Sequence, residues 1–314
     1  MLNRRHIRIK VMQSLYAFKG GESDDLKKDE TFLFHSLDSM YDLYLSMFAL
    51  LTELQKKSKD YNIKFQKKLS ASSTKDISAS KIEDNQLLTL ISDNKMLQET
   101  ISKRKLNFWD LDFEYVDIIF RAILKSQLFT DYAKESENSF AADKSFIINI
   151  FTDIIAPNDK LYDYFEDKRL TWIDDLPVVN TKILKILRKL KLTSPDTALL
   201  PDLYKDEDDK VFAKELFNKT LLNSSKFTEE ISAKAKNWDS ERLASLDGVL
   251  LRMAICEFRK FPSIPFKVTI NEYLEVAKEY STPKSSLFIN GILDKIVKEY
   301  KADNLQLKSG RGLM

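Results

Sequence analysis

The chain has few of the residues on which many enzymes depend. Its 314 residues include one cysteine, two histidines, six glycines and seven prolines. Cys256 has no partner for an intrachain disulfide, which predicts a reducing compartment, the cytoplasm. His6 and His35 belong to no His-Glu-x-x-His or Cys-x-x-Cys sequence, and the glycines form no nucleotide-binding loop. These absences predict a protein with no metal, no cofactor and no catalytic residues, in which Cys256 is a small buried hydrophobic residue.

Two further absences concern membranes and overall charge. No apolar run approaches the roughly 18 residues that span a bilayer, so no membrane partner is expected. The 50 Lys and Arg residues nearly balance the 48 Asp and Glu residues, which leaves a net charge of +2. Any affinity for nucleic acid must therefore come from local basic patches.

Proline and glycine are missing from most of the first half of the chain. No proline precedes Pro157, and no glycine lies between Gly21 and Gly248. Apolar residues in this part recur at the period of an α-helix, so the sequence predicts an all-α fold. We expect a loop at 70–80, where Ser and Ala predominate, and a solvated acidic loop at 206–209. The predicted helices span about 31–69, 82–104, 109–134, 143–155 and 178–192.

The amino-terminal residues form a basic amphipathic helix. Its apolar stripe begins with Ile7 and Val11, Arg4 and Arg8 share one edge, and Arg5 and Tyr16 lie beside them. Guanidinium groups bind phosphates through two parallel hydrogen bonds, so this edge is suited to a nucleic-acid backbone. The alternative is a solvated helix edge that keeps the protein in solution.

Residues 265–296 predict two helices joined by a tight turn. Thr269 and Glu272 have the spacing of a capping box at the first helix start. Ser281-Thr282-Pro283 ends this helix and starts the next one, because proline is tolerated in the first helical turn. The second helix has an apolar stripe from Ile289 to Tyr300.

These carboxy-terminal residues closely resemble the signature of the NusB family of bacterial transcription antitermination and ribosomal RNA processing factors. The matching segments are Lys-Val-Thr-Ile-Asn-Glu at 267–272, Val-Ala-Lys at 276–278 and Phe-Ile-Asn-Gly-Ile-Leu-Asp-Lys-Ile at 288–296, preceded by Trp238, Arg242, Leu243 and the run 247–258. Residues 2–19 resemble the arginine-rich first helix of the family, with departures at Ile7 and Ile9. The resemblance covers about residues 210–300 and 2–19.

The resemblance implies a NusB-like helical bundle with an enlarged helical amino-terminal region. The expected organisation is an amino-terminal region 1–206, containing an insertion at 23–205, a carboxy-terminal module 207–300 and a flexible tail 301–314. It also implies a non-enzymatic antitermination factor that binds single-stranded boxA-like RNA beside NusE, a ribosomal protein, and joins the antitermination complex on RNA polymerase.

The residues to which the resemblance assigns these roles lie near both ends of the chain, and we expect them to converge in one basic groove between the first helix and the carboxy-terminal helices. Asp247 corresponds to a position near the NusE surface. Phe288 was expected at the edge of the buried stripe, ringed by lysines, where an exposed ring stacks on an unpaired base. The expected RNA-binding residues are Arg4, Arg5, Arg8, Tyr16, Lys284, Phe288, Asn290 and Lys295.

Several alternatives stay open from the sequence alone. Phe288 could instead close the core edge, with Gly291 allowing close helix packing, and Asp247 could be a carboxylate favoured by a helix start. The lysines and arginine of 178–192 form either a solvated face or a second nucleic-acid surface. The whole chain could be a helical protein–protein scaffold that has lost RNA binding. An appendage of a ribosomal RNA methyltransferase is less consistent, because the glycine-rich cofactor loop and catalytic cysteines are missing.

Overall fold

A computed structural model describes residues 1–19, 25–69, 78–135, 139–234, 246–303, 305 and 307–310. Regular structure in these ranges is helical throughout, without a strand, which confirms the predicted all-α fold. The chain divides into two compact units: a terminal unit of Met1–Leu37 with Leu203–Met314, and an inserted unit of Asp38–Asp202. The amino-terminal region 1–206 therefore contributes to both units.

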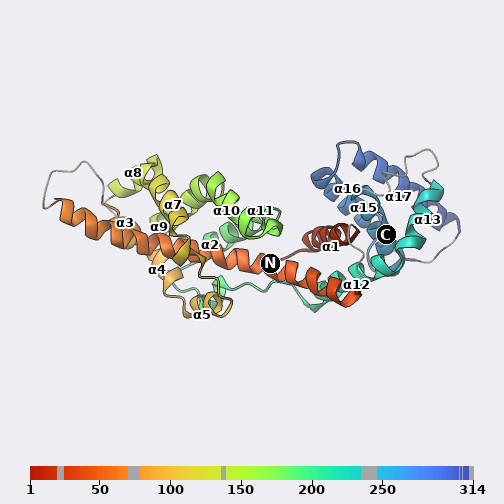
Figure 1. Cartoon of the computed structure of the whole chain (residues 1–314), viewed down its shortest axis with the longest axis horizontal. Helices are drawn as coiled ribbons and strands as arrows, with labels where there is room; N and C mark the ends of the chain where they lie inside the picture. The colour runs from red at the N-terminus through yellow and green to blue at the C-terminus, as the bar shows by residue number, and fades with distance from the viewer. Residues whose placement is uncertain are drawn as a thin grey trace. The chain divides into compact units, whose positions relative to one another are not determined.

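The terminal unit brings the first helix of the chain to its last helices. In Figure 1 the red helix α1 lies beside the blue helices α15 and α16. The unit comprises α1 (Arg4–Lys19), the start of α2 (Leu26–Leu69), α12 (Glu207–Leu222), α13 (Ser224–Lys234), α15 (Leu246–Lys260), α16 (Phe266–Tyr280) and α17 (Ser285–Ala302).

Helix α15 forms the centre of the terminal unit. All of its residues from Asp247 to Phe258 are buried. A helix that is apolar on nearly every side needs neighbours all round, and α1, α12, α13, α16 and α17 each pack against it. Cys256 lies in this core, where burial raises the pKa of its thiol to about 11. The thiol therefore stays protonated at neutral pH, as expected for a structural cysteine.

The inserted unit is built on the remainder of α2, whose residues Leu43, Tyr44 and Phe48 are fully buried. Trp109 and Trp172 join its core, and their indole N–H groups donate to backbone carbonyls of α2. The other elements are α3 (Ser80–Glu83), α4 (Gln86–Ser92), α5 (Lys95–Lys103), α6 (Phe108–Leu111), α7 (Phe113–Lys125), α8 (Gln127–Lys134), α9 (Phe140–Ile150), a π-helical turn η1 (Phe151–Ile155), α10 (Asp159–Lys168), a 3₁₀ turn η2 (Leu170–Trp172), α11 (Leu176–Lys189) and a 3₁₀ turn η3 (Asp196–Leu199).

Two of the predicted helices of this unit are wrong in extent. The stretch 82–104 is three short helices, because Asn85 and Asn94 cap the second and third by accepting from backbone N–H groups. The stretch 109–134 is likewise broken, and Ser126 caps α8. Asn85 also donates to the Tyr132 hydroxyl, which in turn donates to the buried carboxylate of Asp143. These polar side chains hold the turns inside the unit, where an unpaired polar group would be costly.

Three local predictions in the terminal unit are also corrected. Helix α16 starts at Phe266 after Pro265, with no side-chain cap, so Thr269 and Glu272 form no capping box. The acidic stretch 206–209 starts α12, and Asp206 caps this helix by accepting from the Asp209 N–H. The predicted flexible tail is docked at Lys308, whose Nζ donates to the carbonyls of Glu257 and Phe261 at 3.1 and 3.0 Å.

Some residues for which the sequence made predictions lie outside the described residues. They are Trp238, Arg242 and Leu243, most of the loop 70–80, and the last four residues of the chain, 311–314.

Candidate nucleic-acid interface

The three arginines of α1 lie against α12, α15 and α16, and each meets a carboxylate. Arg8 contacts Glu257 on α15, Arg5 contacts Glu272 on α16, and Arg4 contacts Asp209 on α12. The sequence predicted these three arginines as candidate phosphate ligands, but it did not predict their carboxylate partners. Partners so far apart in the chain leave no local signal in the sequence.

Arg8 is a buried structural residue rather than a surface cation. Its Nε and one terminal nitrogen donate to the two oxygens of Glu257 at 2.9 and 2.8 Å, and its side chain is 3% exposed. Burial lowers the pKa of Arg8, but the charge and hydrogen bonds of Glu257 outweigh it and leave the pKa raised. Thr269 also donates to Glu257, at 2.7 Å. The expectation that Arg8 contacts RNA directly therefore conflicts with its place in the core.

Arg4 and Arg5 remain on the surface. Their side chains are 43% and 41% exposed, whereas the carboxylates of Asp209 and Glu272 are 6% and 22% exposed. Arg5 donates to both oxygens of Glu272 at 2.9 and 2.8 Å, which raises the pKa of Arg5 and lowers the pKa of Glu272. Arg4 uses only its Nε, at 3.0 Å from Asp209, and its guanidinium lies over the Phe212 ring. Neither terminal nitrogen of Arg4 has a hydrogen-bond or ion-pair partner among the described residues, so both can bind an incoming anion.

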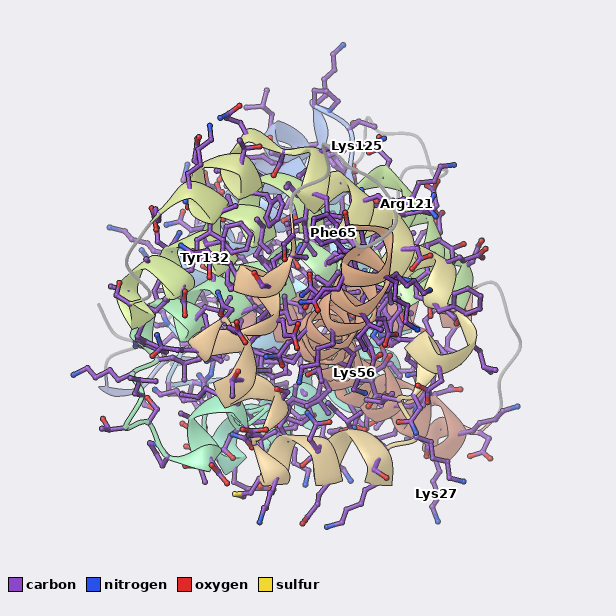
Figure 2. The ribbon with its side chains drawn as sticks, turned by 90° about the vertical axis from the view of Figure 1, so that its left-hand side faces the viewer. Lys27, Lys56, Phe65, Arg121, Lys125 and Tyr132 are labelled. Carbon is purple, nitrogen blue, oxygen red and sulfur yellow. The ribbon has the colours of Figure 1, made fainter. Side chains whose placement is uncertain are left out.

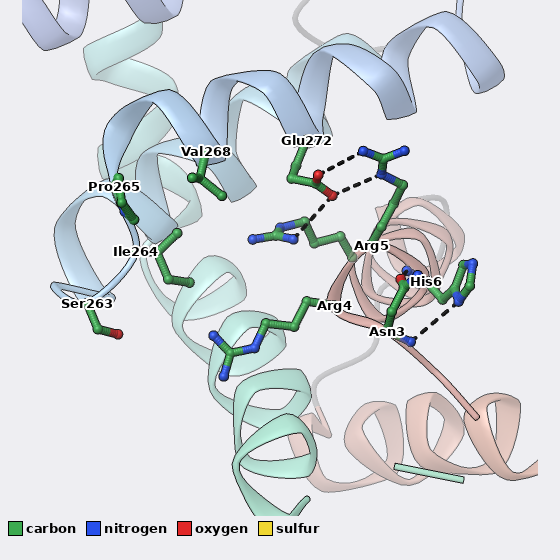
Figure 3. Close-up of a pocket in the computed structure, with 10 residues that line it drawn as sticks. Asn3, Arg4, Arg5, His6, Ser263, Ile264, Pro265, Val268 and Glu272 are labelled. Atoms are coloured by element: carbon green, nitrogen blue, oxygen red, sulfur yellow. Dashed lines mark hydrogen bonds and ion pairs between the residues drawn. The ribbon is translucent and has the colours of Figure 1, made fainter. Parts of the chain in front are cut away.

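These arginines line a cavity of about 520 Å³ between the start of α1 and the start of α16. Figure 3 shows Arg4, Arg5 and His6 on one side and Pro265, Val268 and Glu272 on the other. Asp209 and Glu257, which hold Arg4 and Arg8, are buried and do not line the cavity, so Glu272 is the one carboxylate beside three arginines among the lining residues. An open cavity with anchored guanidinium groups can accept a phosphate without first ordering the side chains.

The candidate residues on α17 divide into buried and exposed sets. Phe288 is 4% exposed, so the partly exposed ring predicted from the sequence is not found. Lys284 and Lys295 are exposed, and Asn290 donates to Asp294 at 3.3 Å. None of these residues lines the arginine cavity. The structure therefore brings both ends of the chain into one unit but does not place the ring of Phe288 at the margin of the cavity.

Gly291 lies on the exposed side of α17. A Cβ added at this position would meet nothing within 4 Å, so helix packing does not require the glycine. Leu287, one helical turn earlier, is 76% exposed. With Lys284 and Lys295 these residues form an exposed stripe of α17, which offers an open backbone between two cations.

The two remaining candidates differ in exposure. Tyr16 of α1 is 52% exposed and can stack or donate a hydrogen bond. Asp247 is 3% exposed and accepts from the Ser281 hydroxyl at 2.6 Å, in the first turn of α15. Its carboxylate therefore ties the start of α15 to the end of α16.

The chain is similar in sequence to known proteins over part of its length. Residues 188–298 match the model of the NusB family. The transcription antitermination protein NusB of Salinibacter ruber is 41% identical over 112 residues, which are 36% of this chain and 70% of that protein. The NusB of Chloroherpeton thalassium is 40% identical over 129 residues, 41% of this chain and 61% of that protein. The NusB of Geotalea daltonii is 48% identical over 85 residues, 27% of this chain and 59% of that protein. No solved structure gives a significant match.

Proposed function

The chain belongs to the NusB family, and we propose that it is a transcription antitermination factor that acts by binding, without a chemical step, in the cytoplasm. Its relatives are named for this role. No described helix combines the length and apolar character that crossing a bilayer requires. The proposed ligand is single-stranded boxA-like RNA, bound together with the NusE ribosomal protein in a complex on RNA polymerase.

The observation that carries this proposal is the arginine cavity. Asp209 and Glu272 hold Arg4 and Arg5 in place, yet each arginine keeps about two fifths of its side chain exposed. Fixed guanidinium groups bind phosphate with little further loss of side-chain entropy. In this proposal Arg4 is the principal phosphate ligand, Arg5 assists it, and Arg8 holds α1 in place.

We assign base and backbone contacts to the exposed stripe of α17 and to Tyr16. Lys284 and Lys295 supply charge, Asn290 supplies hydrogen bonds, and Gly291 allows the strand to approach the helix backbone. Phe288 supports this surface from inside the core. Asp247 then acts on the NusE surface indirectly, by fixing the junction of α15 and α16.

The test is a fluorescence anisotropy titration of the full chain with boxA-like and scrambled RNA, with and without NusE. We expect tighter binding to the boxA-like RNA and a further gain with NusE. Arg4→Gln should weaken binding roughly tenfold, since it removes a bidentate phosphate contact worth 1–3 kcal/mol. Lys226→Gln is the matched control, because Lys226 is an exposed cation of α13 in the same unit.

A gain of affinity separates phosphate binding from loss of folding. Glu272→Gln removes the carboxylate that competes for Arg5, so this variant should bind RNA roughly 2- to 5-fold more tightly. Equal, negligible binding of both RNAs in all conditions would overturn the proposal. It would favour a protein–protein scaffold, for which the pairing of all three arginines with carboxylates is the supporting observation.

A further inference from the structure

Helix α11 of the inserted unit carries four cations that have no acidic partner. Lys185, Arg188 and Lys189 are exposed and Lys182 is half-buried. Their side chains make no ion pair with any residue that the structure describes. The four residues are called the α11 basic face below.

Several other cations of the inserted unit are paired with carboxylates. Arg104 is held by Asp38 and Asp42, Lys168 by Asp112, and Arg169 by Asp42. Lys56 and Arg121, both labelled in Figure 2, also lie near acids: Lys56 pairs with Glu53 at 2.6 Å, and Arg121 lies 3.9 Å from Asp117. The α11 basic face differs from these paired residues in its lack of counter-charge, and it gathers four such cations within eight residues of one helix.

The neighbours of α11 add positive charge to this region. Helix α9 packs against α11, and Lys144 of α9 donates to the carbonyls of Arg188 and Leu190. The acid beside it, Asp143, is buried and accepts from the Gln86 N–H and the Tyr132 hydroxyl. Asp174 and Asp175 precede α11 and lie about 10 Å along the helix axis from Lys182.

The electrostatics of Lys182 agree with this geometry. Burial lowers the pKa of its ammonium group, and the charges of Lys189 and Lys185 lower it further. Like charges held this close repel one another, which costs stability while the surface is empty. A bound polyanion would relieve that repulsion.

The spacing of the four cations suits a polymer of phosphates. Lys182, Lys185 and Lys189 recur at intervals of three and four residues, so they follow one side of the helix over about 10 Å. Arg188 lies next to this line. The apolar residues Val179, Ile183 and Leu187 are fully buried in the unit, so α11 has no free apolar face to insert into a membrane.

We propose that the α11 basic face is a second RNA-binding surface, which holds the phosphate backbone of single-stranded RNA without reading its sequence. The choice of RNA as the polyanion rests on the proposed function. The inserted unit then extends the length of transcript that the protein holds, while the terminal unit supplies the sequence preference.

The test compares two RNAs in anisotropy titrations of the full chain: a short boxA-like oligonucleotide and a longer RNA that carries the same sequence with a flanking single strand. The variant replaces Lys182, Lys185, Arg188 and Lys189 with Gln. The matched control removes the same charge from Lys59, Lys64, Lys67 and Lys125, which are exposed lysines of the same unit. Lys125 is visible at the end of this unit in Figure 2.

We expect the α11 variant to lose ~10-fold or more in affinity for the longer RNA, and the slope of log K against log salt to fall by about 3, as for four phosphate contacts on a single strand. Affinity for the short RNA should stay within about twofold, and the control should change little for either RNA. The thermal midpoint of the α11 variant should not fall, since the substitutions remove mutual repulsion on an exposed face.

Equal losses for the variant and the control, or no loss for either, would refute the second surface. Binding of anionic vesicles by the α11 basic face, with no effect of the variant on RNA, would refute it as well. If the proposed function fails instead, boxA-like and scrambled RNAs bind alike, while the effect of the α11 variant on long RNA persists.

Discussion

Glu257 accepts hydrogen bonds from several separate parts of the terminal unit. It accepts two hydrogen bonds from Arg8 and one from Thr269, and its own backbone carbonyl accepts from Lys308. Helices α1, α15 and α16 and the carboxy-terminal tail therefore meet at one residue. A buried carboxylate of this kind is stable only while its partners satisfy it.

Glu257→Gln should lower the free energy of unfolding by about 3–5 kcal/mol, because it removes the carboxylate that accepts two hydrogen bonds from the buried guanidinium of Arg8 and leaves only Glu272, 3.6 Å away, as a counter-charge. Urea denaturation followed by far-UV circular dichroism measures the loss. Glu30→Gln is the control, since Glu30 is 23% exposed and its pair with Lys214 in the same unit should contribute less than about 1 kcal/mol. Similar losses in both variants would contradict the structural role assigned to the Arg8–Glu257 pair.

Lys308 predicts a pH dependence of opposite sense to that of an ordinary lysine salt bridge. Burial lowers the pKa of Lys308 from 10.5 to about 8. Between these values the unfolded chain binds more protons than the folded chain, so stability rises with pH. Relative to Lys308→Met, the wild type should gain up to roughly 3 kcal/mol between pH 7.5 and 10.5. Comparing the two proteins at each pH cancels the titration of Cys256, and a flat difference would count against the lowered pKa.

The arginines show what a single sequence can and cannot predict at this scale. Their clustering in α1 was evident, and so was the helix that carries them. Their exposure was not, because it depends on Glu257 and Glu272, which are 249 and 267 residues away from Arg8 and Arg5. The predicted exposure of the Phe288 ring was wrong for a related reason. Its position at the edge of an apolar stripe does not show whether a neighbouring helix covers it.

At the scale of elements, the sequence predicted long helices better than interrupted ones. Helix α2 was predicted at 31–69 and spans Leu26–Leu69, and α11 was predicted at 178–192 and spans Leu176–Lys189. The breaks at Asn85, Asn94 and Ser126 were missed, because one side chain that caps a backbone N–H has little effect on hydrophobic periodicity.

Helix α17 gives a prediction in which stability and binding change in opposite directions. Gly291→Ala should stabilise the helix by about 0.5–1 kcal/mol, because the new methyl group meets open space and alanine favours a helix. If RNA approaches the backbone here, the same methyl group should weaken RNA binding. Thermal unfolding and anisotropy titration measure the two effects.

Gly291→Ser is the control for this prediction. It also adds a Cβ atom but gains less helix propensity, so it should weaken RNA binding as much as alanine does while stabilising less. Unchanged RNA affinity in both variants would remove Gly291 from the contact surface.

At the scale of the whole molecule, the chain has two cores within one polypeptide. Trp109 and Trp172 are buried in the inserted unit, whereas the core of the terminal unit centres on α15. The predicted boundary near residue 206 reflected a change in composition. The boundary alone did not show that the first helix of the chain joins the last ones; the resemblance to the NusB family implied this convergence, and the structure confirms it.

Separate cores predict that the two units respond separately to a core mutation. In a Trp238→Phe background, fluorescence reports on Trp109 and Trp172 alone. Leu250→Ala in α15 should destabilise the terminal unit by about 2–5 kcal/mol and shift the urea transition seen by circular dichroism, while the fluorescence transition stays in place. Coincident transitions by both probes in the variant and its parent would show that the cores unfold as one.

The Arg8–Glu257 pair also restricts which substitutions positions 8 and 257 can accept. Both side chains are buried, so replacing one of them alone leaves a buried charge without the partner that hydrogen-bonds it. Two apolar residues of similar volume can replace both. In a library randomised at positions 8 and 257, folded clones should be either doubly charged or doubly apolar, with few mixed combinations. Positions 8 and 257, near the two ends of the chain, should therefore change together or not at all.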